Sequence, residues 1–263
     1  MTANLHDVLI NAAGAIAAFM FAAWLLSLVL KNASIADIVW GAGFVMTAWV
    51  TFFTVGHTLD LRQVLLLAIS TFWGTRLSLH LFKRNRGKPE DSRYKAMRDK
   101  HPASFGWVSL VTVFGLQGVL MFLVSLPVQL GQLSPQTPFG LLAYLGVALC
   151  ATGLFFEVVG DYQLAQFTKN PANHSKVMNK GLWRYTRHPN YFGDSCLWWG
   201  LALIAFDTAY GPWALIGPVV ITFLLTKVSG IPMLEKAMLK SNPLYADYMA
   251  VTSAFVPWLP GKR

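Results

Sequence analysis

Seven apolar segments occupy most of this 263-residue chain and decide what it can fold into. A helix that crosses a bilayer needs about 20 consecutive, mostly apolar residues, because hydrocarbon offers no hydrogen bonds to its backbone. Charged residues make up 13% of the chain, about half the share that is usual in soluble domains. The segments lie at about 8–30, 38–55, 64–82, 107–130, 139–159, 191–206 and 212–225. We therefore predict an all-α integral membrane protein, a seven-helix bundle, and exclude a soluble globule or a disordered chain.

The distribution of basic residues orients the predicted bundle. With the N-terminus outside, alternation of the segments leaves Arg62 outside and Arg76 within a span. The remainder of the 21 Lys and Arg residues then falls on the cytosolic side, as the positive-inside rule requires. We expect the C-terminus in the cytosol and an interfacial amphipathic helix over 233–249. We interpret residues 1–263 as one membrane-embedded domain, with the candidate cofactor-binding half at about 139–263.

The net charge of +9 also has a membrane explanation. Basic loops beside a membrane attract anionic lipid headgroups, so we expect membrane lipids as partners and no nucleic acid. Cys150 and Cys196 both lie in apolar segments and the six His residues are scattered, so the sequence predicts no metal site. We expect the protein to be a monomer.

Acidic side chains within the apolar segments mark the candidate site. Such groups are costly in a membrane and are usually functional. Glu157 and Asp161 are four residues apart and therefore share one face of the fifth predicted helix. Asp194 follows Asn190 by four residues at the start of the sixth. Because the two pairs fall at the same inner depth, we expect one polar cluster.

The loop before the sixth segment carries groups that suit an anion. Pro189 is expected to start a helix, whose free N–H groups and positive dipole end can hold phosphate. Arg187 can bind phosphate through two N–H groups, and Tyr185 and Tyr191 can stack on a flat ring. The other basic candidates are Lys169, Lys176, Arg184 and His188. The pattern favours a flat, anionic, phosphate-bearing cofactor, while ion pairing at the interface is an alternative role for the loop lysines.

The motif Arg-His-Pro-Asn-Tyr-Phe-Gly-Asp at 187–194, preceded by Gly-Leu-Trp-Arg-Tyr at 181–185, resembles the C-terminal part of the steroid 5-alpha-reductase family. The chain is more similar still to its bacterial branch, domain of unknown function 1295 (DUF1295), over nearly its whole length. Further matching stretches lie at 34–41, 84–94 and 229–235. The likeness to the steroid reductases themselves begins at about Gly153. Isoprenylcysteine and phospholipid methyltransferases carry a related Arg-His-Pro-x-Tyr segment.

This resemblance implies a seven-helix reductase of the bacterial inner membrane that binds NADPH from the cytosolic side. It implies no Rossmann fold, and the sequence has no Gly-x-Gly-x-x-Gly after a strand. Two positions depart from the family, since Glu157 replaces an Asn and Lys169 is displaced by one residue. The cofactor-binding residues implied are Glu157, Asp161, Lys169, Lys176, Arg184, Tyr185, Arg187, His188, Asn190, Tyr191, Asp194, Lys227 and Glu235.

The reaction of the family is reduction of a carbon–carbon double bond conjugated to a ketone. The ketone oxygen gains negative charge and needs an acid or a hydrogen-bond donor. The family positions for this donor correspond loosely to Asp37 and Trp73, and His80 or Tyr94 are alternative catalytic residues. Asp37 can serve if burial keeps it protonated, or it can instead be the N-cap of the second helix.

These features together predict an NADPH-dependent oxidoreductase acting on an apolar, enone-bearing lipid such as a 4-ene-3-keto steroid. Two alternatives come from other classes. One is an S-adenosylmethionine-dependent membrane methyltransferase of the isoprenylcysteine or phospholipid type, and the other is a non-catalytic lipid-binding membrane protein.

Overall fold

The computed structural model describes residues 4–56, 60–133 and 137–261, which contain helices and turns but no strand. The chain forms two compact units. Unit 1 comprises the described residues up to Gly140 together with Ile204–Gly217, and unit 2 comprises Leu141–Leu203 with the described residues from Pro218 onward. The interpretation of the chain as one domain stays a prediction.

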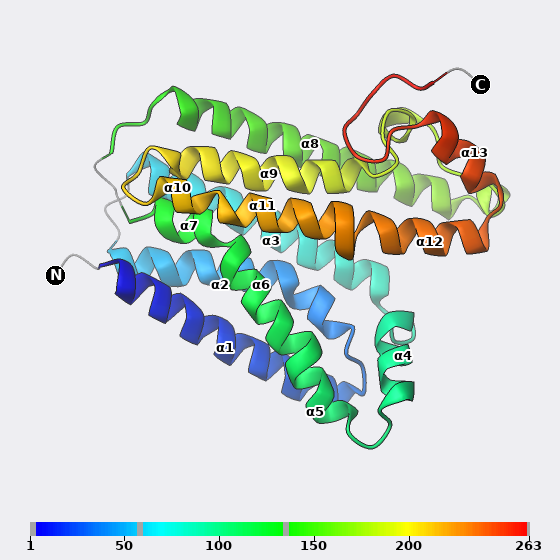
Figure 1. Cartoon of the computed structure of the whole chain (residues 1–263), viewed down its shortest axis with the longest axis horizontal. Helices are drawn as coiled ribbons and strands as arrows, with labels where there is room; N and C mark the ends of the chain where they lie inside the picture. The colour runs from blue at the N-terminus through cyan, green and yellow to red at the C-terminus, as the bar shows by residue number, and fades with distance from the viewer. Residues whose placement is uncertain (1–3, 57–59, 134–136, 262–263) are drawn as a thin grey trace. The chain divides into compact units, whose positions relative to one another are not determined.

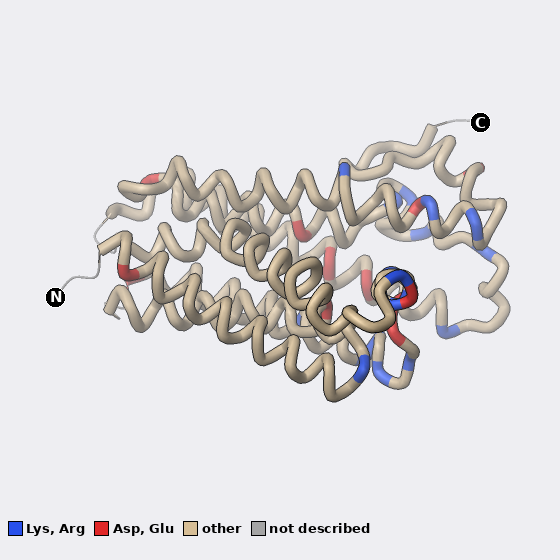
Figure 2. The backbone as a smooth tube through the Cα atoms, turned by 60° about the horizontal axis from the view of Figure 1, so that its bottom comes forward, with Lys and Arg blue, Asp and Glu red and all other residues tan. Residues whose placement is uncertain are grey.

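Unit 1 is built on three long helices joined by shorter ones (Figure 1). Asn4 caps the first helix by accepting a hydrogen bond from the Asp7 N–H, and Lys31 ends it in the left-handed conformation. Lys and Arg residues of this unit gather on α4 and on the last turn of α3, where Lys83 and Arg84 lie (Figure 2). The elements are α1 (Leu5–Leu30), α2 (Ile35–Val55), α3 (Leu61–Asn85), α4 (Ser92–Lys100), α5 (Phe105–Ser109), the π-helix η1 (Leu110–Gly115), α6 (Leu116–Val124), α7 (Leu126–Gly131) and α10 (Gly211–Ala214).

Unit 2 contains the longest helix, α8, and the loop motif singled out in the sequence (Figure 1). Pro189 is the first residue of α9, as its fixed φ and missing N–H predict. Helices α9 and α11 each contribute residues to both units. The elements are α8 (Leu141–Lys169), the short 3₁₀ helices η2 (Pro171–Asn173) and η3 (Gly181–Arg184), α9 (Pro189–Phe206), α11 (Ile216–Phe223), the π-helix η4 (Leu224–Val228), α12 (Ile231–Ser241) and α13 (Leu244–Val251).

Six helical segments among the described residues are long and apolar enough to cross a membrane, which fits an integral membrane protein. Five are α1, α2, α3, the continuous stretch Phe105–Val124, and α8; the sixth is Gly211–Ser241. The remaining predicted span corresponds to α9, which is not among the six. The all-helical class is confirmed, and the count of seven spans stays a prediction.

Three sequence expectations differ from the structure. The fourth segment is not one uniform helix over 107–130, because a π-helix interrupts it and a break at Ser125 separates α6 from α7. The amphipathic stretch over 233–249 is two helices, α12 and α13. The chain leaves the helical conformation at Asn242, which is extended, and Pro243 has no backbone N–H to continue α12. Arg62, expected in an outer loop, lies buried in α3 and donates to the carbonyls of Ile204, Thr137 and Pro138.

Glycines bring the backbones of α8 and α9 into direct contact within unit 2. A Cβ atom added at Gly153 would lie 2.5 Å from the Gly193 carbonyl oxygen and 2.7 Å from the Leu197 nitrogen. Gly200 makes an equally close approach to Gly146 farther along the same two helices. Such small-residue contacts are the usual way for membrane helices to pack closely, since lipid gives no hydrophobic drive between them. The contact fixes which residues of α8 face α9.

Gly153→Ala is predicted to destabilise the protein, because the new methyl group would meet backbone atoms that cannot rotate away. Overpacking of this kind costs about 1–3 kcal/mol. The matched control is Gly14→Ala in α1, where a Cβ would meet nothing within 4 Å and the higher helix propensity of Ala adds up to about 1 kcal/mol. Thermal unfolding in detergent should show a lower midpoint for Gly153→Ala only, and equal midpoints would contradict the packing argument.

Candidate functional site

Polar residues predicted on the fifth and sixth segments meet between α8 and α9. The Asn190 side-chain amide donates to Asp161 Oδ1 at 3.5 Å. Glu157 lies one turn before Asp161 on α8 and is buried, with Gly193 of α9 against its backbone. Asp194 lies one turn after Asn190 and is half-buried. The structure therefore brings Asp161 and Asn190 into contact, with Glu157 and Asp194 one turn away on the same two helices. These four residues are called here the α8–α9 polar cluster, and their role toward a cofactor stays a prediction.

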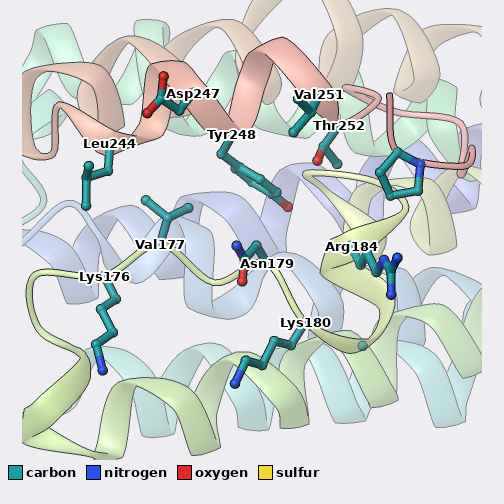
Figure 3. A pocket seen from close by; sticks show the side chains of 12 residues that line it. Lys176, Val177, Asn179, Lys180, Arg184, Leu244, Asp247, Tyr248, Val251 and Thr252 are labelled. Atoms are coloured by element: carbon teal, nitrogen blue, oxygen red, sulfur yellow. The ribbon is translucent and has the colours of Figure 1, made fainter. Parts of the chain in front are cut away.

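A groove of about 690 Å³ opens between the loop that follows α8 and the C-terminal helix α13. Figure 3 shows the loop residues along one wall and α13 along the other. Three cations line it, Lys176, Lys180 and Arg184, against a single acid, Asp247. All four are exposed. The groove therefore presents exposed positive charge to an anionic ligand, beside apolar walls that include Leu244 and Val251.

The groove and the α8–α9 polar cluster share one turn of α8. Gln163 accepts a hydrogen bond from the Leu182 N–H at 2.9 Å, directly after Gly181, which lines the groove. The Trp183 indole donates to the Gly160 carbonyl at 3.0 Å. Gly181 has φ +60°, a conformation that suits glycine because a side chain there would meet Gln163. Gly160 and Gln163 flank Asp161, so the loop is fixed beside the cluster.

Arg187 and His188 converge on Glu235 in the interior of unit 2. The Arg187 guanidinium donates to Glu235 Oε1 at 2.7 Å and to the backbone carbonyls of Met249 and Thr252. His188 Nε2 lies 3.0 Å from the same carboxylate oxygen. All three side chains are buried. This Arg187–His188–Glu235 clamp ties the start of α9 to α12 and to the chain that follows α13.

The clamp gives these residues a positioning role in the structure. Burial lowers the pKa of His188, and the Glu235 carboxylate opposes that shift only in part. A neutral His188 then donates its Nε2 proton to Glu235, and its ring stacks on Tyr191 with the centroids 5.3 Å apart. The guanidinium of Arg187 already has three acceptors. Cofactor binding by Arg187, His188, Tyr191 and Glu235 stays a prediction, and it would require the clamp to rearrange.

The remaining predicted cofactor residues of unit 2 lie apart from the clamp. Lys169 is exposed at the last turn of α8, and Lys227 is exposed on η4. Tyr185 is exposed directly after η3, and its carbonyl accepts from the Trp258 N–H. Neither Lys169, Lys227 nor Tyr185 lines the groove.

Within unit 1 the structure joins two of the predicted catalytic residues. The Tyr94 hydroxyl donates to Asp37 Oδ1 at 2.6 Å, and Arg93 contacts Oδ2 of the same carboxylate at 2.6 Å. Asp37 is not the N-cap of α2, because Ser34 occupies that position and Asp37 lies in the first turn. Burial raises the pKa of Tyr94, and the Asp37 carboxylate raises it further. Tyr94 is therefore a neutral hydrogen-bond donor at physiological pH.

Hydrogen bonds from the preceding loop hold Tyr94 against Asp37. Glu90 accepts from the Ala33 N–H at 2.7 Å and from Arg98, and the Asp91 N–H donates to Ser34 Oγ at 2.8 Å. The Arg98 guanidinium keeps the pKa of Glu90 below its usual range. These contacts fasten α4 to the start of α2.

The other two catalytic candidates, Trp73 and His80, lie on α3. Trp73 is buried in α3 and packs edge-on against Phe44, with the ring centroids 5.5 Å apart. His80 lies half-buried two turns later on α3. Trp73 thus has the surroundings of a core residue.

Sequence reasoning missed Gln117, whose amide donates to the Tyr94 hydroxyl at 3.2 Å. A lone amide within the apolar fourth segment was the available signal. It also missed Lys180, which lies in the basic loop between two residues that were named. Among the described residues, no group of three or more His, Cys, Asp and Glu side chains could hold a metal ion.

Comparisons with known proteins give a family but no activity. The sequence matches the family described as "Protein of unknown function (DUF1295)" over residues 23–252. An uncharacterized protein of Schizosaccharomyces pombe, C594.04c, is 24% identical over 273 aligned positions, which cover 91% of this chain and 77% of that relative. No solved structure matches this chain.

Glu235→Ala is predicted to destabilise the protein by about 3 kcal/mol or more, because Arg187 would be left buried without its carboxylate. The control is Lys236→Ala, an exposed neighbour on α12. The double variant Glu235→Ala/Arg187→Met should recover part of the loss, since it removes the unpaired charge. Thermal unfolding without added ligand measures the midpoints of the three variants. A Glu235→Ala midpoint equal to that of Lys236→Ala would refute the clamp.

Proposed function

Because the chain belongs to the DUF1295 family, whose description assigns no activity, we propose a function from the chemistry of its own residues. The proposed function is NADPH-dependent reduction of a carbon–carbon double bond conjugated to a ketone in an apolar lipid. The proposed location is the bacterial inner membrane, with the N-terminus outside and the cofactor site facing the cytosol. A 4-ene-3-keto steroid is the model substrate.

The donor set of unit 2 is the observation that carries this proposal. A dinucleotide has phosphates, which need cations, together with ribose hydroxyls and a carboxamide, which need carboxylate and amide partners. Lys176, Lys180 and Arg184 line the groove. Asp161 lies on the turn of α8 that is bonded to the groove loop, and Asn190 of α9 contacts it. The residues present therefore fit a phosphate-bearing nucleotide.

The same donor set favours NADPH over S-adenosylmethionine. S-adenosylmethionine also has ribose hydroxyls, so the α8–α9 polar cluster alone would suit either cofactor. It has no phosphate, however, and its sulfonium and ammonium groups outweigh its single carboxylate, so its net positive charge suits a groove with three cations poorly. The methyltransferase alternative is therefore the weaker of the two.

Each group of residues has a proposed task once a cofactor is bound. When bound, NADPH supplies the hydride that adds to the double bond. Lys176 and Arg184 neutralise phosphate charge, while Asp161 and Asn190 hold polar groups of the sugar or the carboxamide. The clamp of Arg187, His188 and Glu235 fixes the start of α9 and so keeps Asn190 facing α8.

Within unit 1, Tyr94 is the residue that we propose as hydrogen-bond donor to a ketone oxygen of an apolar ligand. Its hydroxyl hydrogen points at Asp37 and can turn to a ketone oxygen, where it would stabilise the negative charge that develops. The raised pKa of Tyr94 keeps that hydrogen in place at neutral pH. Asp37 holds the hydroxyl in position, and Arg93 compensates the carboxylate charge.

NADPH is predicted to stabilise the purified protein against heat, and S-adenosylmethionine is not. A ligand at about 100 times its Kd adds roughly 2.7 kcal/mol, which a thermal-shift measurement resolves. Lys176→Gln and Arg184→Gln should each weaken NADPH binding by up to about fivefold at low salt, since one exposed ion pair contributes up to about 1 kcal/mol. Lys240→Gln, an exposed cation of α12, is the control.

Three outcomes of this measurement would count against the proposal. Stabilisation by S-adenosylmethionine alone would favour the methyltransferase. Stabilisation by neither compound would favour the non-catalytic lipid-binding protein. Equal NADPH affinity of Lys176→Gln, Arg184→Gln and the control would remove the groove from the cofactor site.

Tyr94→Phe is predicted to lower kcat for enone reduction by about 100-fold or more, the usual cost of losing one donor to a developing oxyanion. NADPH binding should not change, because the residues assigned to the cofactor are untouched. Tyr162→Phe, which alters an exposed hydroxyl on α8, is the matched control. Turnover of a panel of 4-ene-3-keto steroids and other unsaturated lipids measures the effect. Undiminished kcat in Tyr94→Phe would assign the donor elsewhere.

A further inference from the structure

The chain that follows α13 is a fixed extended strap and not a loose tail. The Ser253 carbonyl accepts from the Arg187 N–H at 2.9 Å, and the Phe255 carbonyl accepts from the Thr186 hydroxyl at 2.8 Å. The Trp258 N–H donates to the Tyr185 carbonyl at 2.9 Å. A further backbone bond, from Gly261 to Val251, closes the strap back on α13 at 2.8 Å. Residues 252–261, called here the C-terminal strap, are therefore held in one path.

This fixed path turns three apolar side chains of the strap outward. Phe255 faces inward, with its ring 5.9 Å from that of Phe192 on α9. Val256, Trp258 and Leu259 are 57%, 74% and 77% exposed. A flexible segment could bury such apolar side chains against the protein, but a segment held by hydrogen bonds cannot. Apolar side chains that stay exposed on a fixed segment therefore mark a contact surface.

Positive charge lies directly beside these side chains. Pro260 of the strap lines the same groove as Lys180 and Arg184. Tyr185, which binds the Trp258 N–H, is the next residue after Arg184 and is itself exposed. Trp and Tyr flanked by Lys and Arg are the residues that membrane proteins place at the boundary between hydrocarbon and headgroups.

We propose that the C-terminal strap inserts Val256, Trp258 and Leu259 into the interfacial layer of the membrane that α8 spans, where Lys180 binds anionic lipid headgroups. A dimer contact, in which this surface would bind the same surface of a second copy, is the weaker explanation of the exposed side chains. A two-fold contact would set the same patch against itself and bring Lys180 and Arg184 against their own counterparts. The proposal goes beyond the reductase function and does not depend on which cofactor binds.

The test places a polarity-sensitive thiol fluorophore at Leu259→Cys in lipid nanodiscs that hold one protein each. Phe155→Cys, exposed on the apolar part of α8, is the control within lipid, and Ala172→Cys, exposed in η2, is the control in water. Cys150 and Cys196 are buried, so the unsubstituted protein measures background labelling. The expected result at position 259 is blue-shifted emission and strong quenching by lipids that carry a nitroxide near the headgroup, with neither effect at position 172.

Anionic lipid should strengthen the insertion. Replacing part of the phosphatidylcholine by phosphatidylglycerol should increase quenching at position 259, and Lys180→Gln should reduce that increase, since one cation near an anionic surface is worth about fivefold in binding. Water-like emission without quenching would overturn the proposal. Blue-shifted emission without quenching by lipid nitroxide would also overturn it, because protein and not lipid would then cover the strap. Quenching that is the same in both lipids would leave no lipid-binding role for Lys180 and would overturn that part.

Discussion

Direct contact between the backbones of α8 and α9 is the constraint on which the candidate site depends. Gly153 and Gly193 approach so closely that neither position has room for a methyl group. This contact sets the rotation of both helices, so Asp161 and Asn190, about two turns and one turn away from it, face each other. Side-chain packing alone would allow several rotations of two apolar helices in lipid. A backbone contact at one point allows very few.

Buried and exposed cations of this protein do different work. Arg62 and Arg187 are buried, and the guanidinium of each donates hydrogen bonds to carbonyls or a carboxylate of its own unit. Such a group is costly to remove and poorly placed to receive a ligand. Lys176, Lys180 and Arg184 keep their charges exposed along a groove. The buried arginines thus hold the fold together, while the exposed cations keep their charges available to an anionic ligand.

The pairing of Tyr94 with Asp37 shows how local distortions serve a polar site in an apolar setting. Gln117, which donates to Tyr94, follows the π-helix η1 directly. One extra residue in a helical turn rotates all later side chains by about 100°. The π-helix therefore helps to decide that Gln117 points at Tyr94 and not into lipid. Helices in membranes tolerate such a break where neighbouring groups satisfy the freed backbone atoms.

The sequence by itself determined the all-helical membrane class, the start of α9 at Pro189 and the placing of Glu157 with Asp161, and of Asn190 with Asp194, on one face of a helix, because hydrophobic length, proline geometry and four-residue spacing act locally. It could not determine that Arg187 turns inward to Glu235, that Asp37 bonds to Tyr94 and not to its own helix end, or that Trp258 faces outward. Each of these depends on a partner 48, 57 or 73 residues away along the chain. Only the tertiary structure decided them, since a polar group takes whichever partner folding brings within about 3 Å, and no local pattern records that distance.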